Sequence, residues 1–299
     1  MSTGGIDLHT HTTHSDGSAT PEELIGLAGA KRARAVAVTD HDTVAALVEA
    51  RAAADRYGIE FVAGIEISAE YSPGTMHILG YCIDDQSPAL GAKLDRLKKA
   101  REERNPRIAN RLRSLGFDIG YDEVAHVAGN NVVGRPHFAR LMIEKGYVAS
   151  IQEAFDRFLK KGAAAYVEKA RLSPAESIAL IHDAGGVAVL AHPYQLRLSS
   201  LEEVERLVGE LAELGLDGVE TVYSRHSAAE RVAFSEIAMR NGLLVTGGSD
   251  YHGTYKPDIS IVTGLGDLNV PYELLEAVKA RAAGRSKGPR ANEVQQGSR

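Results

Sequence analysis

The sequence has very little cysteine and no long apolar run. Cys82 is the single cysteine among 299 residues, which excludes an internal disulfide and a zinc site built from cysteine thiolates. No apolar stretch reaches the roughly 18 residues of a membrane span, and residues 1–15 lack the basic start and apolar run of a signal peptide. We therefore expect a protein of the cytoplasm with no membrane partner. Any metal would have to be bound by histidine, aspartate or glutamate.

The balance of charged residues also limits which classes of molecule the protein is expected to bind. Lys and Arg number 34 against 40 Asp and Glu, which gives a net charge of −6 and no general attraction for a polyanion. We expect no binding of long duplex nucleic acid. A small acidic substrate is compatible with this balance, and the hydrophobic content of 44% is enough for a large folded core.

Apolar segments of strand character recur along the chain and alternate with helical patterns. The segments read GIDLHTH, AVAVTDH, FVAGIEIS, TMHILGYC, VAVLAHP, LDGVETVY and LLVTGGSD. Thr20 and Ser173 each stand before a proline and three residues before a glutamate, which is typical of a helix start. Repeated strand–helix units predict parallel pairing and a (β/α)7 barrel, with a doubly wound open sheet as the alternative.

The alternation stops in the middle of the chain. Residues 83–170 have helical periodicity and almost no strand signal. We expect two barrel portions, residues 1–99 and 169–287, with a helical substrate-binding insertion at 100–168 between them. The last residues, 288–299, lack apolar content and are expected to be a disordered tail.

Metal-binding side chains gather at the ends of the predicted strands. His9 and His11 lie two apart, so on a strand their side chains point to the same side. Residues of the same kinds follow or end the other strands. The full set is His9, His11, Asp16, His41, Glu66, His77, His192, Asp250 and His252.

This set predicts a metal centre. Three carboxylates in one cavity would repel one another, and bound cations remove that penalty. Nine ligands divide naturally into three sets of about three, so we expect three divalent ions. Imidazole and carboxylate without sulfur suit Mn²⁺ first, with Zn²⁺ or Fe²⁺ as alternatives. Such ions would make the pocket attractive to phosphate.

Two features of the insertion indicate an anion site. Leu94 and Leu97 begin an apolar stripe in which Arg101 and Arg104 stand where leucines would be expected, and inward guanidinium groups require an anion. We expect this helix to end before Pro106, which would start a new one.

A second helix is predicted to open at Pro136 and close at Gly146. Arg135 and His137 lie at its amino end, where free N–H groups favour an anion.

The motif series DLHTHTTHSDG, TDHD, GIEIS, HILGY, LAHP and GSDYH resembles the PHP (polymerase and histidinol phosphatase) superfamily. The resemblance implies a distorted (β/α)7 barrel with a trinuclear metal site. It also implies a division of the ligands, with Glu66 bridging two ions. The implied sets are His9, His11, Glu66 and Asp250 for the first ion, Glu66, His77 and His192 for the second, and Asp16, His41 and His252 for the third.

The motifs RPHFAR and YSRHS resemble the branch that removes the 3′-phosphate from 3′,5′-nucleoside bisphosphates, relatives of which also trim short RNA from the 5′ end. The resemblance implies that a hydroxide held by the Glu66-bridged pair attacks phosphorus. It further implies contacts to phosphate or nucleotide from Arg101, Arg135, His137 and His226. His226 could serve as the general acid or as a phosphate ligand.

Three other functions stay open on the sequence. A histidinol-phosphate phosphatase would share the metal ligands but lack a nucleotide-reading insertion. A metal-dependent amidohydrolase would also start with His-x-His, although its usual bridging lysine has no counterpart here. A non-catalytic domain that binds nucleic acid would have no need of three metal ions. No GxSxG, CxxxxxR or P-loop pattern offers a covalent nucleophile or a different phosphate site.

Overall fold

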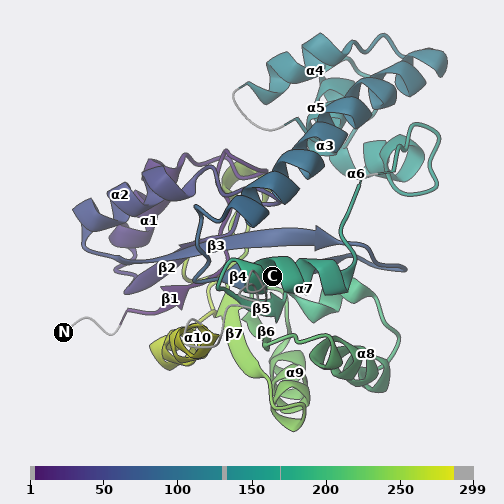
Figure 1. The fold of residues 1–299 in the computed structure, drawn as a ribbon. Helices are drawn as coiled ribbons and strands as arrows, with labels where there is room; N and C mark the ends of the chain where they lie inside the picture. Colours follow the sequence, from purple (N-terminus) through teal and green to yellow (C-terminus); the bar gives the residue numbers. More distant parts are fainter. Residues whose placement is uncertain (1–3, 130–132, 169, 286–299) are drawn as a thin grey trace, which may run out of the picture.

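The computed structural model describes residues 4–129, 133–168 and 170–285 and contains one seven-stranded sheet (Figure 1). The predicted tail at 288–299 lies outside the described residues. Each predicted strand segment contains one strand. The strands are β1 (Ile6–Asp7), β2 (Ala35–Val38), β3 (Glu60–Ala69), β4 (Met76–Tyr81), β5 (Val187–Leu190), β6 (Gly218–Tyr223) and β7 (Leu244–Gly248).

The sheet closes on itself, which confirms the barrel and rules out the open-sheet alternative. The strands lie in chain order from β1 to β7. The segment after β1 then pairs with the end of β7: the Leu8 amide donates to the Gly247 carbonyl at 3.3 Å, and the Asp250 amide donates to the His9 carbonyl at 2.8 Å. The carboxyl ends of the parallel strands therefore meet at one end of the barrel, here called the mouth.

The expectation of parallel strands throughout is wrong for β4. This strand pairs antiparallel with both β3 and β5, whereas the other neighbouring pairs are parallel. The reason is the short connection at 70–75, which holds no helix and can only join antiparallel neighbours. The amino end of β4, rather than its carboxyl end, is therefore at the mouth.

Helices cover the outside of the barrel, as the strand–helix alternation predicted. The N-caps expected at Thr20 and Ser173 are present, and each forms a capping box with the glutamate three residues on. No helix in the described part of the chain is long and apolar enough to cross a membrane. The covering helices are α1 (Pro21–Ala30), α2 (Leu47–Tyr57), α7 (Pro174–Asp183), α8 (Leu201–Glu213), α9 (Ala228–Arg240) and α10 (Tyr272–Arg285).

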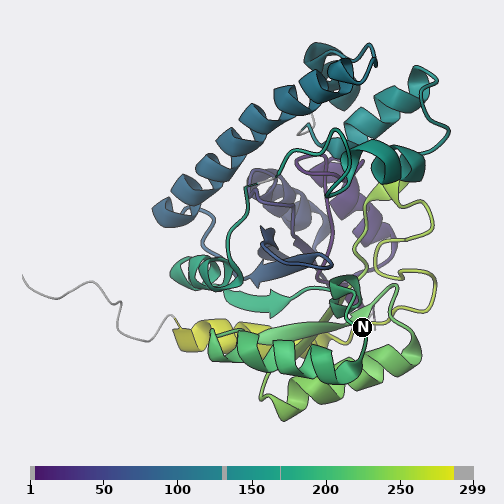
Figure 2. The same ribbon diagram turned by 90° about the vertical axis from the view of Figure 1, so that its right-hand side faces the viewer.

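The insertion is a helical layer carried beyond the barrel on one long helix (Figures 1 and 2). That helix is α3 (Pro88–Ser114), and α4 (Tyr121–Ala128), α5 (Arg135–Glu144) and α6 (Ile151–Ala154) follow it, with one π-helical turn at Phe155–Leu159. The side chains of the insertion form a hydrophobic cluster of their own, separate from the barrel core. This cluster includes Ile108, Leu112, Phe138 and Met142.

The helix break expected before Pro106 is wrong: α3 continues through this residue. The proline lacks the N–H that would bond to the Glu102 carbonyl, but Glu102 lies on the exposed side, where water can replace the lost bond. Packing at both ends keeps the helix whole. Leu94 and Leu97 belong to the barrel core, whereas Ile108 belongs to the core of the insertion.

At the end of the barrel opposite the mouth, a buried carboxylate anchors three elements. Asp217 accepts hydrogen bonds from His182 Nε2 and the Ala188 amide, both at 2.9 Å, and pairs with Arg281 and Arg285 of α10. Burial opposes ionisation, but His182, the Ala188 amide and Arg285 together lower the pKa of Asp217 from 3.8 to about 2. The ionised form is therefore the one that stabilises the fold.

We expect Asp217→Asn to lower the free energy of unfolding by about 2 kcal/mol at pH 7. A depressed pKa gives stability that is complete above the unfolded value and is lost as pH falls through the folded one. The difference from wild type should therefore shrink between about pH 4 and pH 2. Urea unfolding across this range is the measurement. Asp258→Asn, in an exposed pair with Arg225, is the control and should change stability by less than about 0.5 kcal/mol. An unchanged stability of Asp217→Asn at pH 7 would contradict the assignment.

Candidate active site

The structure brings all nine predicted ligands together at the mouth of the barrel, and we call them the metal-ligand cluster. Their donor atoms form overlapping groups in which all atoms lie within 4.8 Å of one another. The groups are His9, His11 and Asp250; His9, Glu66 and His192; His41, Glu66 and His77; and His11, Asp16, His41 and His252.

The strands place these side chains in different ways. Glu66 lies within the long strand β3, on the face it shares with Val62 inside the barrel, and forms a bridge pair with His41 just after β2. His77 is the second residue of β4 and reaches the mouth because that strand runs backwards. His9 and His11 follow β1 rather than lying on it, since the strand ends at Asp7.

Glu66 is the centre of the cluster. Five imidazoles surround its fully buried carboxylate. Its Oε2 lies 3.1–3.2 Å from nitrogens of His9, His11 and His41. Its Oε1 lies 2.7 Å from His77 Nδ1 and 3.0 Å from His192 Nε2. One carboxylate thus contacts the donor atoms of two groups, as a bridging ligand would.

The donor set fits divalent cations. His9 Nε2, His11 Nε2, His41 Nδ1 and Glu66 Oε2 are buried and make no hydrogen bond, although they lie close together. Buried polar atoms normally have a hydrogen-bond partner, so these four unpaired atoms require a partner that they can share. A cation that accepts their lone pairs meets this need, and nitrogen and oxygen donors without sulfur match Mn²⁺, Fe²⁺ or Zn²⁺.

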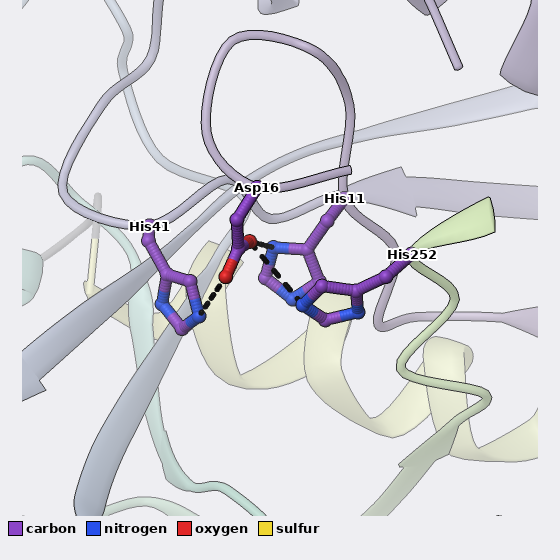
Figure 3. A group of neighbouring side chains, drawn as sticks. All are labelled: His11, Asp16, His41 and His252. Carbon is purple, nitrogen blue, oxygen red and sulfur yellow. Dashed lines mark ion pairs between the residues drawn. The ribbon is translucent and has the colours of Figure 1, made fainter. Parts of the chain in front are cut away.

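Asp16 belongs to the outermost group (Figure 3). Its carboxylate lies 3.2 Å from His252 Nε2, 3.7 Å from His41 Nε2 and 3.8 Å from His11 Nδ1. The Asp16 side chain is 38% exposed, whereas His11 is fully buried. This group therefore faces the solvent side of the cluster, where a substrate would approach.

The groups differ in detail from the division that the resemblance implied. His192 joins His9 with Glu66, whereas His77 joins His41 with Glu66. His77 Nδ1 and His192 Nε2 still lie 3.4 Å apart, so both face the same edge of Glu66. His41 and His252 lie with Asp16 as the resemblance implied, and His11 joins this group as well. The ligands are thus shared among neighbouring groups.

The charges of the cluster are strongly coupled. Burial disfavours a charged His9, but Glu220, Glu66 and Asp250 outweigh it and raise the pKa of His9 well above its usual range. The pKa of His11 rises to about 9 against the same burial, because the carboxylates of Asp250 and Glu66 lie beside its ring and favour the charged form. Burial lowers the pKa of His41 to about 3. Protons balance the carboxylates here, and a divalent cation can replace them.

A cavity of about 210 Å³ joins the cluster to the insertion. Asp16, His41 and Ser68 line one end. The other end, which we call the arginine end, is lined by Arg101, Arg104, Arg135 and His137. The cavity therefore has one wall of metal-ligand residues and one of cationic side chains.

The arginines differ in how their charges are balanced. Arg101 Nη2 donates to Asp42 Oδ2 at 2.8 Å, so its charge is already partnered. Arg104 is 5% exposed and donates to Asn105 Oδ1. Burial and the positive charges of Arg135 and Arg101 lower the pKa of Arg104 to about 10. An anion in the cavity would offset this uncompensated charge.

Arg135 and His137 are fixed by the amino end of α5. Arg135 donates to the Leu159 carbonyl at 3.1 Å, and its guanidinium carbon lies 5.6 Å from the ring centroids of Phe155 and Tyr166. Neither Arg135 nor Arg104 pairs with a carboxylate among the residues described. His137 Nδ1 accepts from the Gly134 amide at 3.0 Å, which leaves Nε2 as the protonated nitrogen.

His226 is not brought to this cavity. It is 3% exposed, its Nδ1 bonds to the Thr221 carbonyl at 2.9 Å, and its ring packs on Tyr223 and Phe234. Its Nε2 is buried without a hydrogen bond. The geometry therefore separates His226 from the other predicted substrate contacts.

Two residues that support Asp250 were not predicted from the sequence. Asp250 Oδ2 is held by Lys256 Nζ at 2.6 Å and Tyr223 Oη at 2.8 Å, so Oδ1 is the oxygen that faces His9 and His11. Tyr223 ends a predicted strand and could have been found by the strand-end rule. Lys256 lies in a loop, and no pattern in the sequence indicates its partner.

The shared role of Glu66 leads to a test by elemental analysis. Wild-type protein supplemented with Mn²⁺ and then desalted should retain bound divalent ions. Glu66→Ala should lose a larger share of them than Asp16→Ala, because Glu66 belongs to two groups and Asp16 only to the outermost one. Circular dichroism checks that both variants fold. Greater loss in Asp16→Ala would contradict the arrangement.

Comparison with known proteins adds an independent line of evidence. A model of the PHP domain matches residues 7–214. A 3′,5′-nucleoside bisphosphate phosphatase of Chromobacterium violaceum is 36% identical over 248 residues, covering 83% of this chain and 87% of the relative. The 5′-3′ exoribonuclease Rnm of Escherichia coli is 36% identical over 248 residues, covering 82% of this chain and 84% of the relative.

A solved structure is similar over almost the whole length. It is described as an amidohydrolase from Chromobacterium violaceum with bound sulfate and no metal. The identity is 33% and the TM-score 0.81, with 93% of this chain and 97% of the other covered. Both the barrel and the resemblance expected from the motifs are thereby confirmed. The chain belongs to the PHP domain family.

Proposed function

We propose that this protein is a metal-dependent phosphoesterase that removes the 3′-phosphate from 3′,5′-nucleoside bisphosphates. The observation that carries the proposal is the single cavity shared by the metal-ligand residues Asp16 and His41 and the buried, carboxylate-free Arg104 and Arg135. A substrate with two phosphates matches a cavity with two separate sites for anions.

The metal-ligand cluster is the place of reaction. Divalent ions bound there supply Lewis acidity toward phosphate oxygens and lower the pKa of water. About three ions are expected from the donor groups, with Mn²⁺ as first choice and Zn²⁺ or Fe²⁺ as alternatives. Lys256 and Tyr223 orient Asp250 for this task. The carboxylate of Glu66 lies at the centre of the five histidines that would share the ions with it. We place the activity in the cytoplasm.

The arginine end recognises the second phosphate. Arg104 and Arg135 supply the free positive charge there, while the charge of Arg101 is paired with Asp42. His137 is neutral because burial lowers its pKa, and its protonated Nε2 can donate to a phosphate oxygen. The amino end of α5 adds its free N–H groups.

Similar proteins support this assignment. The Chromobacterium violaceum phosphatase carries this activity in its name, and the structural relative binds sulfate, an anion shaped like phosphate. That relative is described as an amidohydrolase, but the bridging position here is Glu66 rather than a lysine. A histidinol-phosphate substrate would leave the arginine end without a phosphate to bind.

Trimming of short RNA from the 5′ end is a second candidate. The 5′ nucleotide of a phosphorylated RNA is a nucleoside 5′-phosphate whose 3′-phosphate continues into the chain. A site that holds the 5′-phosphate at the arginine end would therefore place the same 3′ ester bond at the cluster. The exoribonuclease relative from Escherichia coli favours this reading. The role of His226 as general acid stays a prediction, because that residue does not line the cavity.

Arg135→Ala tests the proposed second phosphate site. Each charged hydrogen bond lost costs roughly 1.5–3 kcal/mol, so kcat/KM on a 3′,5′-bisphosphate should fall about 10- to 150-fold. On the 3′-monophosphate it should change little, since that substrate has no second phosphate. Steady-state phosphate release from both substrates, measured in Mn²⁺, is the assay.

Arg140→Ala is the matched control. This arginine lies on the same helix, is exposed and pairs with Glu144, so both substrates should be cleaved as by wild type. Equal losses on the two substrates in a folded, metal-loaded Arg135→Ala would contradict a second phosphate site at Arg135. A wild-type enzyme indifferent to the 5′-phosphate would overturn the nucleotide assignment but leave the phosphoesterase intact.

A further inference from the structure

Glu220 is a buried acid beside the metal-ligand cluster that the mechanism above does not use. It lies within β6, which supplies none of the nine ligands. Its side chain is fully buried and does not line the cavity that would hold the substrate. A buried carboxylate at such a place needs partners, and two partners are present.

Each oxygen of Glu220 accepts one hydrogen bond from a different ligand residue. Oε1 lies 2.9 Å from His9 Nδ1. Oε2 lies 2.9 Å from the backbone amide nitrogen of His192. His9 and His192 share one donor group with Glu66, and their rings stack with centroids 5.6 Å apart. A single side chain therefore contacts two ligands of the same group.

The two contacts orient the ligands in different ways. Because Oε1 accepts, Nδ1 of His9 carries a proton, which leaves Nε2, 3.2 Å from Glu66 Oε2, as the nitrogen that would bind a cation together with Glu66. His192 has φ 27° and ψ 70°, a left-handed conformation that a residue with a Cβ seldom adopts. The bond from its amide to Glu220 holds that backbone and keeps His192 Nε2 3.0 Å from Glu66 Oε1.

We propose that Glu220 is a positioning residue of the metal centre, which fixes the tautomer of His9 and the backbone of His192 so that both bind one cation with Glu66. The inference rests on the metal centre of the proposed function. Residues that orient metal ligands in this way typically contribute a factor of about 10–100 to metal affinity.

The residue just before the same strand offers a matched control. Asp217 also accepts one bond from a histidine ring and one from a backbone amide, those of His182 and Ala188, both at 2.9 Å. Neither of these partners belongs to the metal-ligand cluster. Asp217→Asn thus breaks the same kind of contact far from the mouth.

Glu220→Gln keeps the volume but leaves only one accepting oxygen. Either the new amide N–H faces the His192 N–H, or it faces His9 Nδ1 and forces the proton onto Nε2, where it blocks metal binding. We expect Glu220→Gln to bind Mn²⁺ about 10- to 100-fold more weakly than wild type, measured by competition with a chromophoric chelator. Asp217→Asn should lower the melting temperature and leave Mn²⁺ affinity unchanged.

A second measurement does not depend on the variant folding. In wild-type protein loaded with diamagnetic Zn²⁺, ¹⁵N NMR of the histidine rings should show His9 protonated at Nδ1 and unprotonated at Nε2. Metal coordination through Nδ1 would overturn the inference. So would a folded Glu220→Gln that binds Mn²⁺ as wild type does, or an equal loss in Asp217→Asn. In each of these cases wild type still binds metal, whereas a wild type that binds none overturns the proposed centre itself.

Discussion

The crowding of five imidazoles around the buried carboxylate of Glu66 is the constraint on which the site depends. A charge of this kind is costly to bury, and lone pairs that converge without hydrogens repel one another. The arrangement is favourable only with cations among the donors, either protons or metal ions. The barrel supplies the rigid frame that prevents the ligands from moving apart, because each ligand follows or lies within a strand fixed by its neighbours.

The arginine end has the opposite charge: two cationic side chains there lack anionic partners among the described residues. Arg104 and Arg135 are held in place by carbonyl oxygens and aromatic rings rather than by carboxylates. Their positive charge is therefore available to a substrate anion. The unbroken helix α3 fixes the distance between the two ends, since it packs into the barrel core at Leu94 and into the insertion core at Ile108. One rigid element thereby sets the spacing between the metal-ligand cluster and the arginine end.

Much of this could be predicted from local pattern. Apolar runs in the sequence predicted the buried strands. The N-caps at Thr20 and Ser173 were predicted from the glutamate three residues after each of them. The gathering of the nine predicted residues followed from the rule that strand ends meet at one edge of a barrel. His77 was found for an incomplete reason, since β4 runs antiparallel and presents its amino end. Pro106 was misjudged because packing at both ends of α3 outweighs one lost hydrogen bond.

The sequence by itself determined the strand segments, the chemistry of the donors and the absence of a cysteine-based site, because periodicity and side-chain type are local properties. Only the tertiary structure decided which arginines are free. Asp42 neutralises Arg101 from 59 positions away. The tertiary structure also decided the contact between Glu220 and His9, which lie 211 positions apart in the sequence. Charge balance and tautomer depend on partners brought together by folding, and no spacing along the chain encodes them.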